Sequence, residues 1–234
     1  IDEFIAYARD ALADESSGYE ALIGPGTMRL SPGDETLAAP KKLPQMPSYH
    51  LTRPGGAGIT LVNIGVGPSN AKTATDHIAV LRPHVWLMVG HCAGLRTTQS
   101  LGDYVLAHAY QREDKDISQL EGFELKRIMR TGTVATVDNR NWELRDQSGP
   151  VQRLSQSRAV ALDMESATIA ANGFRFRVPY GTLLCVSDKP LHGELKLPGM
   201  ASAFYTTQVS RHLHIGIRAM EKLREMSQSR LHSR

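Results

Sequence analysis

The sequence predicts an α/β protein, a three-layer α/β/α sandwich around a mixed central sheet. Two observations predict this fold: strand-length apolar runs alternate with helical segments after residue 59, and glycine or proline marks most junctions. Hydrophobic residues make up 41% and charged residues 22% of the 234 residues. This ordinary balance supports a core and excludes a wholly disordered or fibrous chain.

Residues 1–29 are predicted to form an N-terminal helix and a lead-in, because Phe4, Ile5, Ala8 and Leu12 recur at helical spacing. The chain opens on isoleucine inside this pattern and carries no signal peptide's basic start. We therefore expect a fragment from which an N-terminal domain is missing.

Residues 30–58 are predicted to be irregular, since they hold five prolines and four glycines. A stretch of this length exceeds the ~12–15 residues of a plain loop and indicates a functional cover or a linker.

The α/β core is predicted over 59–226, followed by a basic tail at 227–234. Strands are expected at 59–64, 85–89, 104–110, 133–137 and 180–187. Helices are expected at 70–81, 163–172 and 200–226, with Gly173 ending the second. The third carries Leu213, Ile217, Met220 and Leu223 on one face.

Charge and cysteine content exclude several classes of partner. Lysine and arginine number 27 against 24 aspartates and glutamates, an excess too small and scattered for a nucleic-acid surface but suited to a small anion. The longest apolar run, Val85–Val89, is far shorter than the ~20 residues of a membrane helix. With only Cys92 and Cys185 there is no disulfide framework, so we expect a reducing cytoplasm.

Ligands of such folds bind at the carboxyl ends of strands. Gly65, Gly67 and Ser69 follow one expected strand and precede a helix, where backbone N–H groups can converge on an anion. A tight strand-to-helix turn is the simpler interpretation of this segment alone. His91, in the glycine turn expected at 90–95, is either an anion donor or a turn histidine.

Three carboxylates are further candidates. Asp188 ends the strand expected at 180–187, where burial can raise its pKa and make it a proton donor; a capping role is the alternative. Asp163 and Glu165 open a helix and either interact with its dipole or accept hydrogen bonds from sugar hydroxyls.

Other chemistries lack their motifs. The sequence contains neither His-Glu-x-x-His nor Cys-x-x-Cys, so no metal site is expected. It also lacks the Gly-x-Ser-x-Gly elbow of serine hydrolases and a complete dinucleotide fingerprint.

Five motifs in this order resemble the nucleoside phosphorylase/nucleosidase family: 65–70, 90–95, Gly102-Asp103, 163–167 and 186–188. The segments LVNIGVGPSNAKTATDHI, VGHCAGLR, ALDMESATIAANG and LLCVSDKPLHGELKLPGM are most similar to its AMP-hydrolysing members. In those members a regulatory domain precedes the catalytic one. The resemblance also implies a homohexamer, regulation by ATP and phosphate, and no cofactor in the catalytic domain.

The resemblance implies roles for single residues. Asp188 corresponds to the acid at N7 of the purine, Glu165 to the acceptor of ribose hydroxyls, and Met164 to the residue packed on the sugar. Gly65–Ser69 and His91 line the side where phosphate sits in phosphorylases.

Two further positions match the family less closely. Trp142 corresponds to a base-stacking aromatic, with core packing as the alternative, and Arg29 to an early phosphate-binding arginine. Met88 stands where hexameric phosphorylases have an arginine for phosphate, and His91 replaces their serine. These departures favour water over phosphate as the nucleophile.

The resemblance therefore implies hydrolysis of the N-glycosidic bond of AMP to adenine and ribose 5-phosphate. One alternative is a purine nucleoside phosphorylase or a nucleosidase acting on unphosphorylated nucleosides. Another is a nucleotide-sensing module without catalysis, against which the presence of both Asp188 and Glu165 argues.

Overall fold

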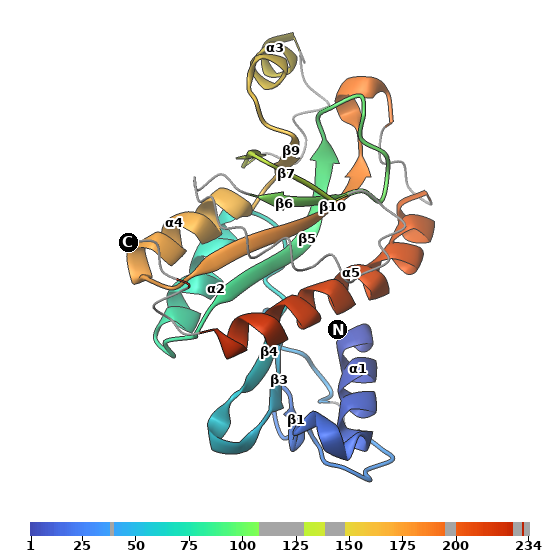
Figure 1. Ribbon diagram of the computed structural model, residues 1–234, viewed down its shortest axis with the longest axis vertical. Helices are drawn as coiled ribbons and strands as arrows, with labels where there is room; N and C mark the ends of the chain where they lie inside the picture. Colours follow the sequence, from blue (N-terminus) through green and yellow to red (C-terminus); the bar gives the residue numbers. More distant parts are fainter. Residues whose placement is uncertain (38–39, 108–128, 139–147, 195–199, 227–230, 232–234) are drawn as a thin grey trace. The chain divides into compact units, whose positions relative to one another are not determined.

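The computed structural model describes residues 1–37, 40–107, 129–138, 148–194, 200–226 and 231 (Figure 1). The chain forms two compact units, Ile1–Gly65 and Val66–Arg234. No helix within the described ranges is long and apolar enough to span a bilayer.

The first unit is a helix with a small antiparallel sheet in the order β2-β1-β3-β4. Its elements are α1 (Asp2–Ala13), β1 (Ala21–Ile23), β2 (Arg29–Leu30), β3 (Ser48–Thr52) and β4 (Gly58–Val62), with short 3₁₀ turns at Glu15–Ser17 and Pro54–Gly56. Phe4, Ala8 and Leu12 are the buried residues of α1, as its periodicity predicts.

Two expectations about this unit are corrected. The segment 30–58 is not irregular throughout, because β3 lies inside it and pairs with both β1 and β4. Tyr49 and Leu51 are buried while their neighbours are not, so a period-2 strand was hidden among the prolines. The strand expected at 59–64 appears as β4, but it belongs to this small sheet and not to the central one.

The second unit contains a six-stranded mixed sheet in the order β7-β6-β10-β5-β9-β8. Its strands are β5 (Trp86–Gly94), β6 (Tyr104–Ala107), β7 (Met129–Gly132), β8 (Val134–Thr136), β9 (Ala161–Asp163) and β10 (Tyr180–Asp188). Its helices are α2 (Pro68–Ala79), α3 (Ser148–Gln156), α4 (Ser166–Phe176) and α5 (Met200–Glu225), with a 3₁₀ turn at Pro190–His192. The pairs β10–β5, β6–β7 and β8–β9 are parallel, whereas β10–β6 and β5–β9 are antiparallel.

Helices cover both faces of this sheet (Figure 1). On one face α5 approaches closely: a Cβ on Gly216 would lie 2.7 Å from Val89 Cγ2. On the other face α4 packs against β10, β8 and β5. The predicted three-layer sandwich with a mixed sheet is confirmed.

Two boundaries inside this unit are also corrected. β5 continues through Gly94, so residues 90–94 form strand and not the predicted glycine turn. Gly94 serves close packing there, because a Cβ would lie 2.9 Å from Val186 Cγ1. Gly173 does not end α4; it lies within the helix, where a Cβ would meet the Tyr180 ring at 2.1 Å.

Candidate active site

The helices α2 and α4 begin side by side, and this junction holds Glu165. The Gly67 N–H donates a hydrogen bond of 2.5 Å to Glu165 Oε1. Gly67 is the N-cap residue of α2, and its φ of +103° strains any residue with a Cβ. Glu165 is the N-cap residue of α4. Its carboxylate therefore lies at the positive end of the α2 dipole, while its backbone begins α4.

Glu165 is a buried carboxylate, with 9% of its surface exposed. Burial raises its pKa above the usual value, and the charge of Asp163 raises it further. Hydrogen bonds from the backbone N–H groups of Gly67 and Met164 act in the other direction and lower this pKa. These donors favour the charged form, so the site presents a held hydrogen-bond acceptor.

Asp163 closes β9 directly before this acceptor. One carboxylate oxygen accepts from Thr136 Oγ1 at 2.7 Å, and the other accepts from the Ser166 N–H at 2.9 Å and from the Ser166 hydroxyl. Thr136 Oγ1 in turn accepts from the Ala167 N–H at 3.0 Å. Burial raises the pKa of Asp163. Asp163 and Thr136 thus cap α4 from neighbouring strands and fix the position of Glu165.

Asp188 ends β10, beside the carboxyl end of the parallel strand β5. The register shifts between Val186 and Asp188, which places Asp188 opposite Ala93. Such an irregularity re-aims the side chains that follow it. The Ser187 hydroxyl donates to Asp188 Oδ1 at 2.5 Å and lies 3.3 Å from the Cys92 carbonyl oxygen. Asp188 is half-buried at this edge of the sheet.

The side chain of Met88, on β5, contacts the start of α4. The Ser166 Oγ lies 3.6 Å from Met88 Sδ, and Met88 packs against the buried cluster around Cys92 and Val186. The position at which the resemblance expects a phosphate-binding arginine thus holds an apolar thioether, partly buried against the core.

His91 lies on the opposite face of β5 from Met88, as the alternation of a strand requires. Its ring centroid is 6.0 Å from Phe204 and 5.7 Å from His212, both on α5. Burial lowers the pKa of His212 to about 3, and its Nε2 lies 3.2 Å from the Leu183 carbonyl oxygen. The structure therefore groups His91 with Phe204 and His212 of α5.

The remaining predicted site residues fall into three groups. Met164 lies half-buried between Asp163 and Glu165, and Ser69 lies in the first turn of α2. Gly65 and Arg29 belong to the first unit. Trp142 lies outside the described residues.

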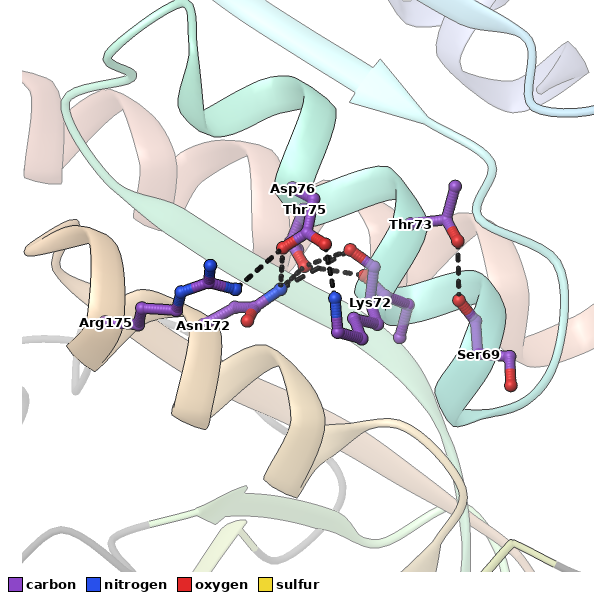
Figure 2. Close-up of polar contacts among 8 residues, drawn as sticks. Ser69, Lys72, Thr73, Thr75, Asp76, Asn172 and Arg175 are labelled. Atoms are coloured by element: carbon purple, nitrogen blue, oxygen red, sulfur yellow. Dashed lines mark hydrogen bonds and ion pairs between the residues drawn. The ribbon is translucent and has the colours of Figure 1, made fainter.

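A polar cluster between α2 and α4 was not predicted from the sequence (Figure 2). Its members are Lys72, Thr75, Asp76, Asn172 and Arg175. The available signal was Asn172 itself, a polar residue beside the apolar Ile169, Ala170 and Gly173 of one helix. Among the residues that the structure describes, no three histidine, cysteine, aspartate or glutamate side chains gather as a metal site.

Comparison with known proteins matches this sequence to one superfamily. The chain is 53% identical over 266 aligned positions to AMP nucleosidase of Escherichia coli K12, an alignment covering all of this chain and 54% of that protein. The chain thus spans about half the length of the curated relatives it matches. Residues 116–215 match the Phosphorylase superfamily. The chain belongs to the phosphorylase superfamily.

Two solved structures of this superfamily share the fold. AMP nucleosidase from Bacteroides thetaiotaomicron superposes with a TM-score of 0.56 at 26% identity, covering 94% of this chain and 85% of that one. A Campylobacter jejuni 5'-methylthioadenosine/S-adenosylhomocysteine nucleosidase gives 0.65 at 18% identity, covering 95% and 96%. The predicted family and fold are confirmed.

Proposed function

We propose that this chain hydrolyses the N-glycosidic bond of AMP and releases adenine and ribose 5-phosphate. The observation that carries the proposal is the 53% identity to AMP nucleosidase along the whole of this chain. The carboxylates Glu165 and Asp188 supply two groups that the reaction needs.

Glycosidic cleavage passes through an oxocarbenium-like transition state, so negative charge beside the ribose lowers the barrier. Glu165 supplies that charge. Gly67 engages Oε1 at 2.5 Å, and we assign Oε2 to a ribose hydroxyl. Asp163 holds Glu165 in place through α4, and Met164 packs on the sugar.

Adenine is a poor leaving group as an anion, and a proton or a strong hydrogen bond at N7 relieves its charge. We assign this role to Asp188, whose carboxylate is oriented by the Ser187 hydroxyl at 2.5 Å. On the phosphate side we place Gly67, Ser69 and His91. Trp142 stays a candidate contact to the base.

Water is the proposed nucleophile. Hexameric phosphorylases hold inorganic phosphate with an arginine at this position, and Met88 instead is a partly buried apolar side chain packed against the core. Reaction in ¹⁸O-labelled water is therefore expected to place the label in ribose 5-phosphate.

Release of free base from AMP and from adenosine, with and without inorganic phosphate, tests the proposal. We expect a higher kcat/KM for AMP and no requirement for phosphate. Faster turnover of adenosine would indicate a nucleosidase, phosphate-dependent ribose 1-phosphate a phosphorylase, and no turnover a sensing module.

We further propose that the protein is a cytoplasmic homo-oligomer, a hexamer as in the AMP-hydrolysing members, regulated by ATP and phosphate without a catalytic cofactor. Sedimentation velocity with and without these ligands tests the assembly. A stable, active monomer would contradict it.

A further inference from the structure

The helices α2 and α4 are connected at two levels. At their starts, Gly67 donates to Glu165. Further along, the Asn172 side-chain amide donates to Thr75 Oγ1 at 2.7 Å and to Asp76 Oδ1 at 2.9 Å (Figure 2).

The two contacts lie at matching distances along the two helices. Asn172 follows Glu165 by seven residues and Thr75 follows Gly67 by eight. At 1.5 Å per residue, both second-level contacts lie roughly 10–12 Å along helices that run in the same direction. Two contacts at this separation resist both sliding and rotation of one helix on the other.

The second level is built from buried groups. Asn172 is 6% and Thr75 is 5% exposed, and a buried amide without a partner is destabilising. Buried polar pairs are best attested as devices that specify one packing register. Thr75 Oγ1 also donates to the Ala71 carbonyl at 2.6 Å, so its lone pair points toward Asn172.

Charged groups lie on the outer side of the contact between Asn172 and Asp76. Lys72 Nζ lies 2.5 Å and Arg175 Nη1 3.7 Å from the Asp76 carboxylate. Lys72 is the main cause that lowers the pKa of Asp76. Asp76 is therefore an ionised acceptor for Asn172 at neutral pH.

We propose that Asn172 is a positioning residue for Glu165: it fixes the register of α2 on α4 and so keeps the Gly67 N–H on Glu165 Oε1. The inference rests on the proposed function, because that function places Glu165 at the ribose.

A shift of α2 has a defined consequence at Glu165. The Gly67 hydrogen bond opposes the effects of burial and of Asp163, the titratable neighbour that faces this carboxyl. Losing the bond raises the pKa of Glu165, so a smaller fraction is ionised at a given pH. The acidic limb of the kcat/KM profile for AMP then moves to higher pH.

The decisive variant is Asn172→Asp, which has the same shape but sets a carboxylate against Asp76. We expect kcat/KM for AMP to fall by roughly 10- to 100-fold, the range of a small misplacement remote from the chemistry. The double variant Asn172→Asp/Asp76→Asn restores an amide–carboxylate pair in reverse and is expected to recover most of the loss. If the single variant does not fold, Thr75→Val removes one partner of the same contact.

Two controls separate positioning from stability alone. Thr73→Ala removes an exposed hydroxyl that bonds only its own helix, to the Ser69 carbonyl, and is expected to behave as the parent. Ile169 is a buried residue of α4, so Ile169→Val is expected to lower the melting temperature. It is expected to leave the acidic limb of the kcat/KM profile in place.

Amide hydrogen exchange at Gly67, measured by NMR without nucleotide, reports the first-level contact independently of activity. Faster exchange in Asn172→Asp, reversed in the double variant, is the expected result. Parental exchange at Gly67 together with a parental kcat/KM would overturn the inference. If the parent releases no adenine from AMP the proposed function fails, whereas the exchange result still decides whether Asn172 fixes the register.

Discussion

Glu165 and Asp188 are both carboxylates at the ends of secondary-structure elements, but their surroundings differ. Glu165 is buried at the starts of two helices, with a backbone N–H on one oxygen. Asp188 is half-buried at an irregular strand end, with a hydroxyl on one oxygen. A backbone donor is fixed, whereas a hydroxyl rotates between donating and accepting. The first environment suits a permanent acceptor and the second a group that exchanges a proton.

The largest expected effect is at Asp188. Asparagine can donate one hydrogen bond to the base but cannot transfer a proton, so Asp188→Asn is expected to lower kcat for AMP by ~10²–10⁴-fold with little change in KM. Steady-state kinetics with a melting curve as the folding control measure this. A kcat within a few-fold of the parent would leave Asp188 as a capping residue only.

A smaller effect, spread over both parameters, is expected at Glu165. Glu165→Gln keeps the shape and an acceptor for Gly67 but removes the charge that stabilises the cationic ribose, so kcat/KM is expected to fall by about 10²-fold. Because the ribose contact exists in ground and transition states, KM is expected to rise as kcat falls. An unchanged KM would remove the difference drawn between the two carboxylates.

The smallest expected effect is on stability, which we expect a substitution at Glu165 to increase and not to decrease. Burial raises the folded-state pKa of Glu165 above the usual 4.5. Its contribution to stability is then fully present below the unfolded pKa and is lost as pH rises through the folded pKa. Glutamine has no such loss, so Glu165→Gln is expected to melt above the parent at pH 8 and at the same temperature near pH 4. Equal melting at both pH values would show that burial does not penalise this charge.

Several elements could be read from local pattern, because the evidence for them lies within a few residues. The spacing of Phe4, Ala8 and Leu12 marks α1, and the apolar run after Tyr180 marks β10. The prediction was wrong where glycine or proline was taken as the sign of a turn or an irregular segment but lies in or beside a strand. Gly94 lies within β5, at a position where Val186 leaves no room for a Cβ. β3 is a paired strand within a proline-rich stretch.

The family, the α/β class and the candidate carboxylates could all be predicted from the sequence, since these depend on residue type, local periodicity and motif order. What each carboxylate contacts depends on how the folded chain packs. Gly67 meets Glu165 from 98 residues away, and Thr75 meets Asn172 from 97. No local spacing encodes such pairs, because they form only when the packing of α2 on α4 brings both ends together.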